Sequence, residues 1–298
     1  MSVILFGYYG FNNAGDELLL DETVKLIQEL SRPFVVANGP IPTPFPMFNR
    51  WNLFSWIKHL TRAKAIVFGG GSVFQSSTST WSLLYYVWIV QLAGWCQTKV
   101  ILLCHGWGPF KHPWHERLAS WALRSAKRSW RLQTTSPRFL MDPVFCDLTL
   151  TQGGSPVVKA TDEVVMCVRP KIDKEVWSVI NGQFSSVTRL TCQVTSGQRS
   201  LLDIWNSDAM SPSLVVTDRY HVGIWAIRRG VPWVGISTDP KLVDLAGRTK
   251  QTCHASVSDF RHVDKEPLTT NNPLVDWAKQ WPPIRPTIRE WLHASIDH

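Results

Sequence analysis

Short apolar runs alternate with longer segments of helical apolar spacing along most of this chain. The runs typical of strands are residues 3–6, 34–37, 65–68, 100–104, 163–168, 214–216 and 233–236. Segments such as 17–30 and 115–128 carry apolar residues at the spacing of an amphipathic helix. Repeated strand–helix units form parallel sheets that helices cover. The alternation therefore predicts an α/β fold with two Rossmann-like domains.

A polar, glycine-containing segment at residues 151–155 interrupts this alternation before it restarts at Glu163. We expect a linker near residues 150–160, with an N-terminal domain over 1–150 and a C-terminal domain over 160–298. A chain of 298 residues is long enough for two domains with a core each.

Net charge favours anionic partners. The formal charge is +8 and the isoelectric point is about 9.3. We expect no nucleic acid partner, because no dense Lys/Arg run, zinc motif or RNA-binding signature is present. The most basic stretch, residues 124–131, is expected to be a solvated helix face.

The compartment is expected to be the cytoplasm. No basic segment followed by an apolar one precedes the first strand, so we expect no signal peptide. The most apolar stretch, residues 83–93, is too short to cross a bilayer and is expected to be a buried helix or one that touches a membrane. The six cysteines show no close pairing, and we expect Cys104 and Cys167 to be buried thiols.

The strand at residues 214–216 is followed by Arg219 and His221, and then by a segment of helical spacing. Open α/β sheets bind ligands at the carboxyl ends of their strands, and a helix N-terminus there favours an anion. A fixed cation beside an imidazole indicates chemistry on a phosphate or carboxylate. Alternatively, Arg219 pairs with Asp218 or Asp239 and His221 only caps the helix.

Two glycine-rich loops follow other predicted strands. Residues 7–17 contain three glycines, which permit close approach of the backbone to a ligand. Asp16 in this loop is either a helix N-cap or a base that takes a proton from a hydroxyl. The second loop, residues 69–72, offers unhindered amides. His112 and His115 lack a carboxylate pattern that would complete a zinc site, so we expect no metal.

Several segments occur in a fixed order along the chain: GYYGFNNAGDE at 7–17, GGGS at 69–72, HGWGP at 105–109, DPVF at 142–145, VRP at 168–170 and an Arg/His block at 218–241. They resemble motifs of the polysaccharide pyruvyl transferase family, within it the branch that pyruvylates cell-wall polymers (CsaB-like). Asn12 stands where the family has glycine, and His105 where it has glutamine. The family's arginine–aspartate pair is not recognisable around residues 133–138.

The resemblance implies a glycosyltransferase-B-like architecture, with two Rossmann-like domains facing a cleft. It also implies transfer of a pyruvyl group from phosphoenolpyruvate to two hydroxyls of a sugar, which gives a ketal and phosphate without a cofactor or metal. The N-terminal domain would hold the acceptor and the C-terminal domain phosphoenolpyruvate. The implied catalytic residues are His221 as general acid, Arg219, and Asp16 as base. The implied substrate-binding residues are Arg169, Lys241, Gly10, Asn13, Gly70, Gly71, Ser72 and His105.

The partner that the resemblance implies is a lipid-linked or polymeric sugar, so we expect peripheral contact with the inner face of the membrane. Two alternatives stay open. A nucleotide-sugar glycosyltransferase of the same architecture would use basic loops for a diphosphate. A wall-assembly scaffold would keep the fold without turnover.

Overall fold

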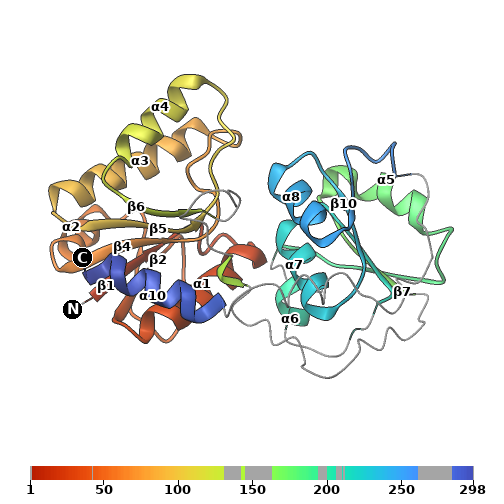
Figure 1. Cartoon of the computed structure of the whole chain (residues 1–298), viewed down its shortest axis with the longest axis horizontal. Helices are drawn as coiled ribbons and strands as arrows, with labels where there is room; N and C mark the ends of the chain where they lie inside the picture. Colours follow the sequence, from red (N-terminus) through yellow and green to blue (C-terminus); the bar gives the residue numbers. More distant parts are fainter. Residues whose placement is uncertain are drawn as a thin grey trace. The chain divides into compact units, whose positions relative to one another are not determined.

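The computed structural model describes residues 2–41, 43–130, 142–144, 163–193, 200–205, 210, 212–260 and 284–297. The chain divides into two compact units (Figure 1). The first unit contains residues 1–147 and 283–298, and the second contains residues 148–282. The segment around 133–138, Phe145 of the DPVF motif and the predicted linker lie outside the described residues.

The first unit is built on a six-stranded sheet in the order β3-β2-β1-β4-β5-β6, and every neighbouring pair of strands is parallel. This is the strand order of a Rossmann fold, with its reversal between β1 and β4. The strands are β1 (Ser2–Phe6), β2 (Arg32–Ala37), β3 (Met47–Asn49), β4 (Ala63–Gly69), β5 (Lys99–His105) and β6 (Lys127–Trp130). The helices are α1 (Ala14–Gln28), α2 (Leu53–Leu60), α3 (Thr80–Trp95), α4 (Pro113–Ala122) and α10 (Ile284–Asp297).

Both faces of this sheet are covered, because consecutive apolar residues of its central strands point to opposite faces. Alternate residues, such as Ile4 and Phe6, pack with α2, α3 and α4. The residues between them, such as Val3 and Leu5, pack with α1 and α10. Figure 1 shows α3 and α4 on one side of the sheet and α1 and α10 on the other.

The C-terminal helix corrects the predicted range of the second domain. We expected that domain to run to residue 298, whereas residues 283–298 belong to the first unit. Ile288, Leu292 and Ile296 of α10 are buried against α1 and the sheet, and Lys99 Nζ donates to the carbonyl of Ile296 (2.9 Å). Amphipathic spacing can identify such a helix, but it does not say which sheet the apolar face will cover.

The second unit has a five-stranded parallel sheet in the order β11-β10-β9-β7-β8. Its strands are β7 (Glu163–Cys167), β8 (Ser186–Arg189), β9 (Leu214–Thr217), β10 (Trp233–Ile236) and β11 (Thr252–His254). Its helices are α5 (Pro170–Ile180), α6 (Leu201–Trp205), α7 (Tyr220–Arg229) and α8 (Pro240–Thr249). The order reverses between β7 and β9. The predicted α/β fold with two Rossmann-like units is therefore confirmed.

The helix predicted over 115–128 ends early. Helix α4 stops at Ala122, and residues 127–130 form β6 at the edge of the sheet. Residues 124–130 of the basic stretch, which we expected on a helix face, are thus a turn followed by an edge strand. Its strand character was hidden because the side chain that it buries is Ser129, whose hydroxyl binds the backbone of β5.

Cys104 and Cys167 are buried thiols, as expected. Within those ranges, no helix is long and apolar enough to cross a membrane. The apolar stretch 83–93 lies in α3, which buries one face against the sheet.

Candidate functional site

Four side chains of the predicted site follow the carboxyl ends of three neighbouring strands in the second unit. Arg169 follows β7, Arg219 and His221 follow β9, and Lys241 follows β10. Since all three strands are parallel, these residues lie along one edge of the sheet. Arg169 and Arg219 flank the point where the strand order reverses, which is where open α/β sheets bind ligands.

A buried aspartate holds these two arginines together. The side chain of Asp218 is 3% exposed and accepts hydrogen bonds from the backbone N–H (3.0 Å) and Nε (2.6 Å) of Arg169. Nε of Arg219 lies 3.4 Å from the other side of the same carboxylate, at Oδ1. The ion pair that we considered as an alternative role for Arg219 is therefore present. It does not exclude binding, because both guanidinium groups remain partly exposed.

The backbone at this edge is fixed as well. The hydroxyl of Thr217 donates to the carbonyl of Cys167 (2.7 Å) and accepts from the N–H of Arg219 (2.9 Å), which ties the end of β9 to the end of β7. Arg169 and Arg219 are themselves the N-cap residues of α5 and α7, and neither side chain caps its helix. Two helix N-termini and two guanidinium groups therefore favour an anion at the same place.

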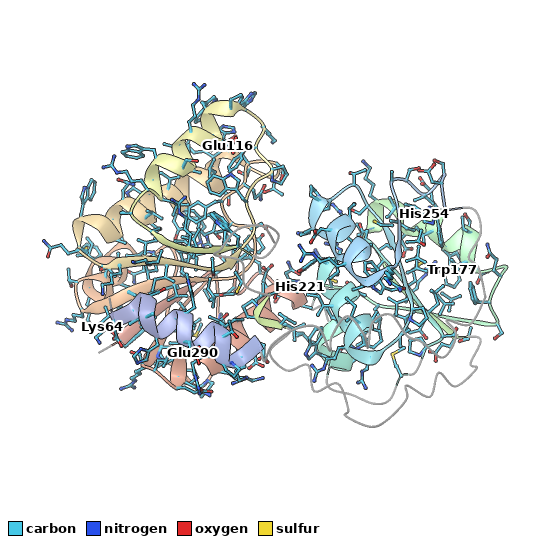
Figure 2. All side chains as sticks on the ribbon, viewed as in Figure 1. Lys64, Glu116, Trp177, His221, His254 and Glu290 are labelled. Atoms are coloured by element: carbon cyan, nitrogen blue, oxygen red, sulfur yellow. The ribbon has the colours of Figure 1, made fainter. Side chains whose placement is uncertain are left out.

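His221, labelled in Figure 2, is the second residue of α7 and is partly buried. The centroid of its ring lies 5.3 Å from that of Tyr220. It does not occupy the capping position, so that alternative is wrong. Lys241 is the second residue of α8, and its Nζ lies 3.4 Å from Oδ2 of Asp239. Asp239 also caps α8 by accepting from the N–H of Lys241 (3.2 Å). Asp239 therefore pairs with Lys241, and Asp218 with the arginines.

In the first unit, the loop after β1 is organised by carboxylates. Gly10 has φ +76°, and its N–H donates to Oε1 of Glu17 (2.9 Å). Asn13 is the N-cap of α1, and its side-chain amide donates to the carboxylate of Asp16. Asp16 is the third residue of the helix, so the interpretation of Asp16 as the N-cap is wrong. The carboxylate is partly exposed, which leaves it accessible to a hydroxyl group.

The loop after β4 lies beside the loop after β1. Gly70 and Gly71 both adopt positive φ, +80° and +79°, in the left-handed region that favours glycine. A Cβ atom on Gly71 would lie 3.7 Å from Oδ1 of Asp16, so the two loops meet at the point where the strand order of this sheet reverses. Ser72, which follows, is partly exposed. Gly71 and Asp16 belong to segments that are far apart in the sequence, and the fold brings them together.

His105 has a different position from the one that we predicted. It is 1% exposed at the end of β5, and its Nε2 accepts a hydrogen bond from the N–H of Val73 (3.1 Å). A ring with so little exposed surface does not present itself to a substrate. His105 therefore positions the loop that contains Gly70, Gly71 and Ser72.

Arg50 is a residue that sequence reasoning missed. It directly follows β3 and is buried, and its guanidinium carbon lies 4.9–5.5 Å from the centroids of five aromatic rings: Phe6, Phe11, Trp51, Tyr85 and Tyr86. Nη2 donates to the hydroxyl of Tyr86 (3.2 Å), whose pKa burial raises to about 12. Through Phe11, this cation supports the loop after β1. The aromatic residues around Arg50 come from distant parts of the sequence, so no local sequence pattern identifies this cluster.

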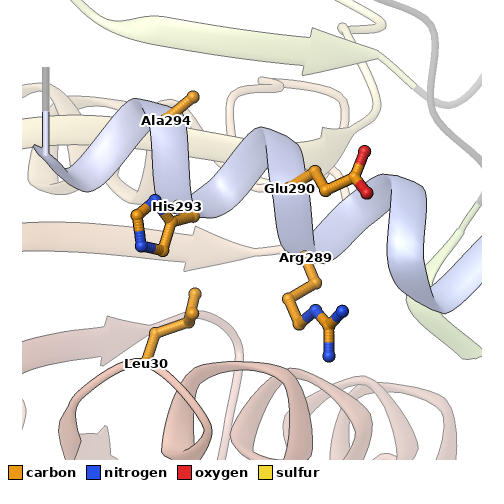
Figure 3. A pocket seen from close by; sticks show the side chains of 5 residues that line it. All are labelled: Leu30, Arg289, Glu290, His293 and Ala294. Carbon is orange, nitrogen blue, oxygen red and sulfur yellow. The ribbon is translucent and has the colours of Figure 1, made fainter.

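A pocket lies between α10 and the end of α1 (Figure 3), lined by Leu30, Arg289, Glu290, His293 and Ala294. Leu30 precedes β2, so the pocket is at the amino edge of the first sheet, away from the candidate residues of the first unit. No group of three or more His, Cys, Asp or Glu side chains that could hold a metal ion occurs in the part of the chain that the structure describes.

A family model described as polysaccharide pyruvyl transferase matches residues 13–184. No curated protein matches the sequence significantly. Similar solved structures include S. aureus MnaA with UDP (TM-score 0.57, 10% identity, 95% of this chain and 92% of that chain). HepE of Anabaena with UDP-glucose has a TM-score of 0.55 at 11% identity, and the match covers 98% of this chain and 99% of that chain. MurG of Acinetobacter baumannii has a TM-score of 0.50 at 9% identity, and the match covers 100% of this chain and 95% of that chain. These likenesses show the fold, which is glycosyltransferase-B-like.

Proposed function

Because this chain belongs to the polysaccharide pyruvyl transferase family, we propose that it transfers a pyruvyl group from phosphoenolpyruvate to a sugar of a cell-wall or surface polysaccharide precursor. The product is a pyruvate ketal, as in the CsaB-like branch. The observation that carries the proposal is the buried carboxylate of Asp218, which holds Arg169 and Arg219 at the reversal of the second sheet.

Phosphoenolpyruvate has a carboxylate and a phosphate, and the second unit has cations suited to both. A guanidinium group binds either anion through two parallel N–H donors. With Nε of Arg169 and of Arg219 directed at Asp218, the two terminal nitrogens of each group are the donors that a ligand would use. Lys241 adds a point charge after the neighbouring strand.

The reaction needs one proton delivered to carbon and protons removed from two hydroxyls. Protonation of the methylene carbon of phosphoenolpyruvate by His221 would form the methyl group and an oxocarbenium-like centre. One acceptor hydroxyl attacks this centre and loses its proton to Asp16. The second hydroxyl then displaces phosphate, which leaves with the remaining proton. The two new C–O bonds form the ketal, and no redox step is required.

The acceptor would be held by the loops of the first unit. Gly10, Gly70 and Gly71 have no side chains, so a sugar could approach their backbone closely, although the N–H groups of Gly10 and Gly70 already donate to Oε1 of Glu17 and to the carbonyl of Phe68. Asn13 and Ser72 offer polar side chains. We propose that a lipid-linked or polymeric sugar in the cytoplasm is the acceptor. His105 takes part through the loop that it positions.

The test is phosphate release from phosphoenolpyruvate with and without lipid-linked amino-sugar acceptors, together with mass spectrometry of the sugar product. We expect acceptor-dependent phosphate release and a product with the mass of a pyruvate ketal. Turnover of UDP- or GDP-sugars without any use of phosphoenolpyruvate would instead identify a nucleotide-sugar glycosyltransferase. Binding of the polymer without turnover of either donor would indicate a scaffold.

A further inference from the structure

Exposed apolar side chains are concentrated on the three helices that cover one face of the first sheet. Among the described residues, the exposed large hydrophobic side chains of α2, α3 and α4 are Leu53, Phe54, Ile57, Trp81, Trp88, Trp95, Trp114 and Trp121. In the second unit as described, Val243 alone is in this class. These eight residues, here called the aromatic face, do not belong to the core that α2, α3 and α4 form with the sheet.

The exposed tryptophans of helix α3 lie on one side of that helix. Trp81, Trp88 and Trp95 recur every seven residues, which places them on one side of a helix. Trp81 is 81% and Trp95 is 77% exposed. The stripe runs for about 21 Å at the rise of an α-helix. None of the 16 residues of α3 is charged, although this side faces away from the core. A helix that is apolar on both sides requires a second apolar partner.

The two neighbouring helices repeat this arrangement. On α4, Trp114 and Trp121 are again seven residues apart, and Arg117 lies on the same side between them. On α2, Phe54 is 87% exposed and Ile57 is exposed in the same turn. α2, α3 and α4 pack on the same side of the sheet (Figure 1).

The sequence around this face has no acidic residue over a long span. Between Glu29 and Glu116 there is no Asp or Glu, and the segment contains seven basic residues: Arg32, Arg50, Lys58, Arg62, Lys64, Lys99 and Lys111. These residues, 30–115, therefore carry +7 of the chain's net +8. Glu116, labelled on α4 in Figure 2, is where acidic residues resume.

Some of these cations already have partners on the opposite side of the sheet. Lys64 pairs with Asp297, and Lys99 donates to the carbonyl of Ile296, both in α10. Five exposed cations lie on α2 and α4 or within two residues of their ends: Lys58, Arg62, Lys111, Arg117 and Arg124. Among the described residues, none of them has a carboxylate partner.

We propose that the aromatic face of α2, α3 and α4 docks on an anionic lipid leaflet, with the helices parallel to the membrane surface. Tryptophan and phenylalanine favour the level of the lipid headgroups, and unpaired Lys and Arg side chains are attracted to anionic lipids. The proposal names the surface that would make the peripheral membrane contact expected from the sequence. The proposal does not depend on the reaction of the protein.

A second copy of the chain is the other occupant that an apolar face could have. Two copies joined through this face would bring Lys58, Arg62 and Arg117 of one copy close to those of the other. Like charges across an interface are unfavourable. An anionic leaflet covers the apolar side chains and neutralises the same cations, so the charge pattern favours lipid.

The experiment is co-sedimentation of the full chain with vesicles of phosphatidylcholine, alone or mixed with phosphatidylglycerol, at low and high salt. We expect binding to the mixed vesicles at low salt, release at high salt and little binding to phosphatidylcholine alone. A chain that stays in the supernatant with mixed vesicles at low salt would overturn the proposal.

Two sets of variants locate the surface. Phe54→Ser combined with Trp81→Gln and Trp95→Gln should abolish binding without lowering the melting temperature, because all three side chains are exposed. Val243→Ser, an exposed apolar position of the second unit, is the matched control and should bind like the parent chain. Equal binding by the triple variant and the parent would exclude the aromatic face.

Charge-reversal variants distinguish binding through the aromatic face from attraction by the net charge of the protein. Lys58→Glu with Arg117→Glu should weaken binding to the mixed vesicles by about tenfold or more. Lys171→Glu with Lys174→Glu makes the same change in net charge on α5 and should have a smaller effect. An equal loss in both pairs would mean unspecific attraction and would contradict the proposal. The proposal would also be contradicted if the parent chain were a dimer and the triple variant a monomer. The aromatic face would then be the interface with a second copy of the chain.

Discussion

Oδ2 of Asp218 lies 2.6 Å from Nε of Arg169, although the two residues are 49 positions apart in the sequence. They follow neighbouring parallel strands, β9 and β7, at the reversal of strand order in the second sheet. The same carboxylate contacts Arg219. A single buried anion thus sets the orientation of two cations at this edge of the sheet.

Asp218→Asn should weaken the binding of phosphoenolpyruvate, because the two guanidinium groups lose the charge that orients them. A hydrogen bond to a charged group contributes about 1.5–3 kcal/mol, which corresponds to a roughly tenfold to hundredfold rise in the KM for phosphoenolpyruvate. Steady-state kinetics with each substrate varied checks this. Asp244→Asn, which removes the partner of Arg248 on α8, is the control and should leave this KM unchanged.

Arg219→Lys keeps the charge but loses the planar pair of donors that suits a carboxylate or phosphate. We expect a large rise in the KM for phosphoenolpyruvate and little change in the KM for the acceptor. Arg248→Lys alters an arginine in a two-point ion pair with Asp244 and provides the comparison. If Arg219→Lys raised both Michaelis constants equally, the role of Arg219 would be structural.

His221→Ala should lower kcat by ~10²–10⁴-fold, the usual contribution of a general acid, while the melting temperature changes little. His293→Ala, on the exposed side of α10, is the matched control. Kinetics and calorimetry on the same preparations separate loss of turnover from loss of fold. Near-normal pyruvyl transfer by folded His221→Ala would exclude the acid role.

Gly70→Ala should destabilise the first unit, because the added Cβ would lie 2.7 Å from Cδ2 of Leu19 at a φ of +80°. Strain of this kind costs about 1–3 kcal/mol. Gly94→Ala has no atom within 4 Å of its added Cβ and lies in α3, so it should be neutral or stabilising. Denaturant unfolding measures both. A Gly70→Ala protein as stable as the parent would contradict the strained conformation of this turn.

Glu17→Gln should show a pH-dependent gain in stability. Burial raises the pKa of Glu17, although the hydrogen bond from the N–H of Gly10 acts in the opposite direction. A carboxyl group with a raised pKa in the folded state contributes stability that is present below its unfolded pKa and is lost as the pH rises through its folded pKa. Glutamine does not titrate and keeps the acceptor oxygen.

The variant and the parent should therefore be similar in stability near about pH 4, and the variant should be the more stable near about pH 7. Melting temperatures across this pH range check the prediction. Glu29→Gln, at an exposed ion pair with Arg289, is a control of equal charge change. If the stability advantage of Glu17→Gln over the parent fell as the pH rises, the pKa of Glu17 would be lowered in the folded state and the prediction would be wrong.

Strong apolar runs were sufficient to predict the central strands of both sheets, including β1, β4, β5, β7 and β9. Such strands are buried on both faces, so nearly every residue in them is apolar. The edge strands β3, β8 and β11 were not predicted. They have three or four residues and bury few of them, so their sequences differ little from those of loops.

The sequence by itself determined the α/β class, the two Rossmann-like units and the loops that carry the candidate residues, because strand and helix periods are local properties of a chain. Only the tertiary structure decided which of those residues meet. Packing of parallel strands brought Asp218 to Arg169, buried His105 under its loop and enclosed Arg50 in aromatic rings. It also placed α10 on the first sheet. Such contacts depend on strand order and on the choice of a partner surface, and neither is encoded in the spacing of neighbouring residues.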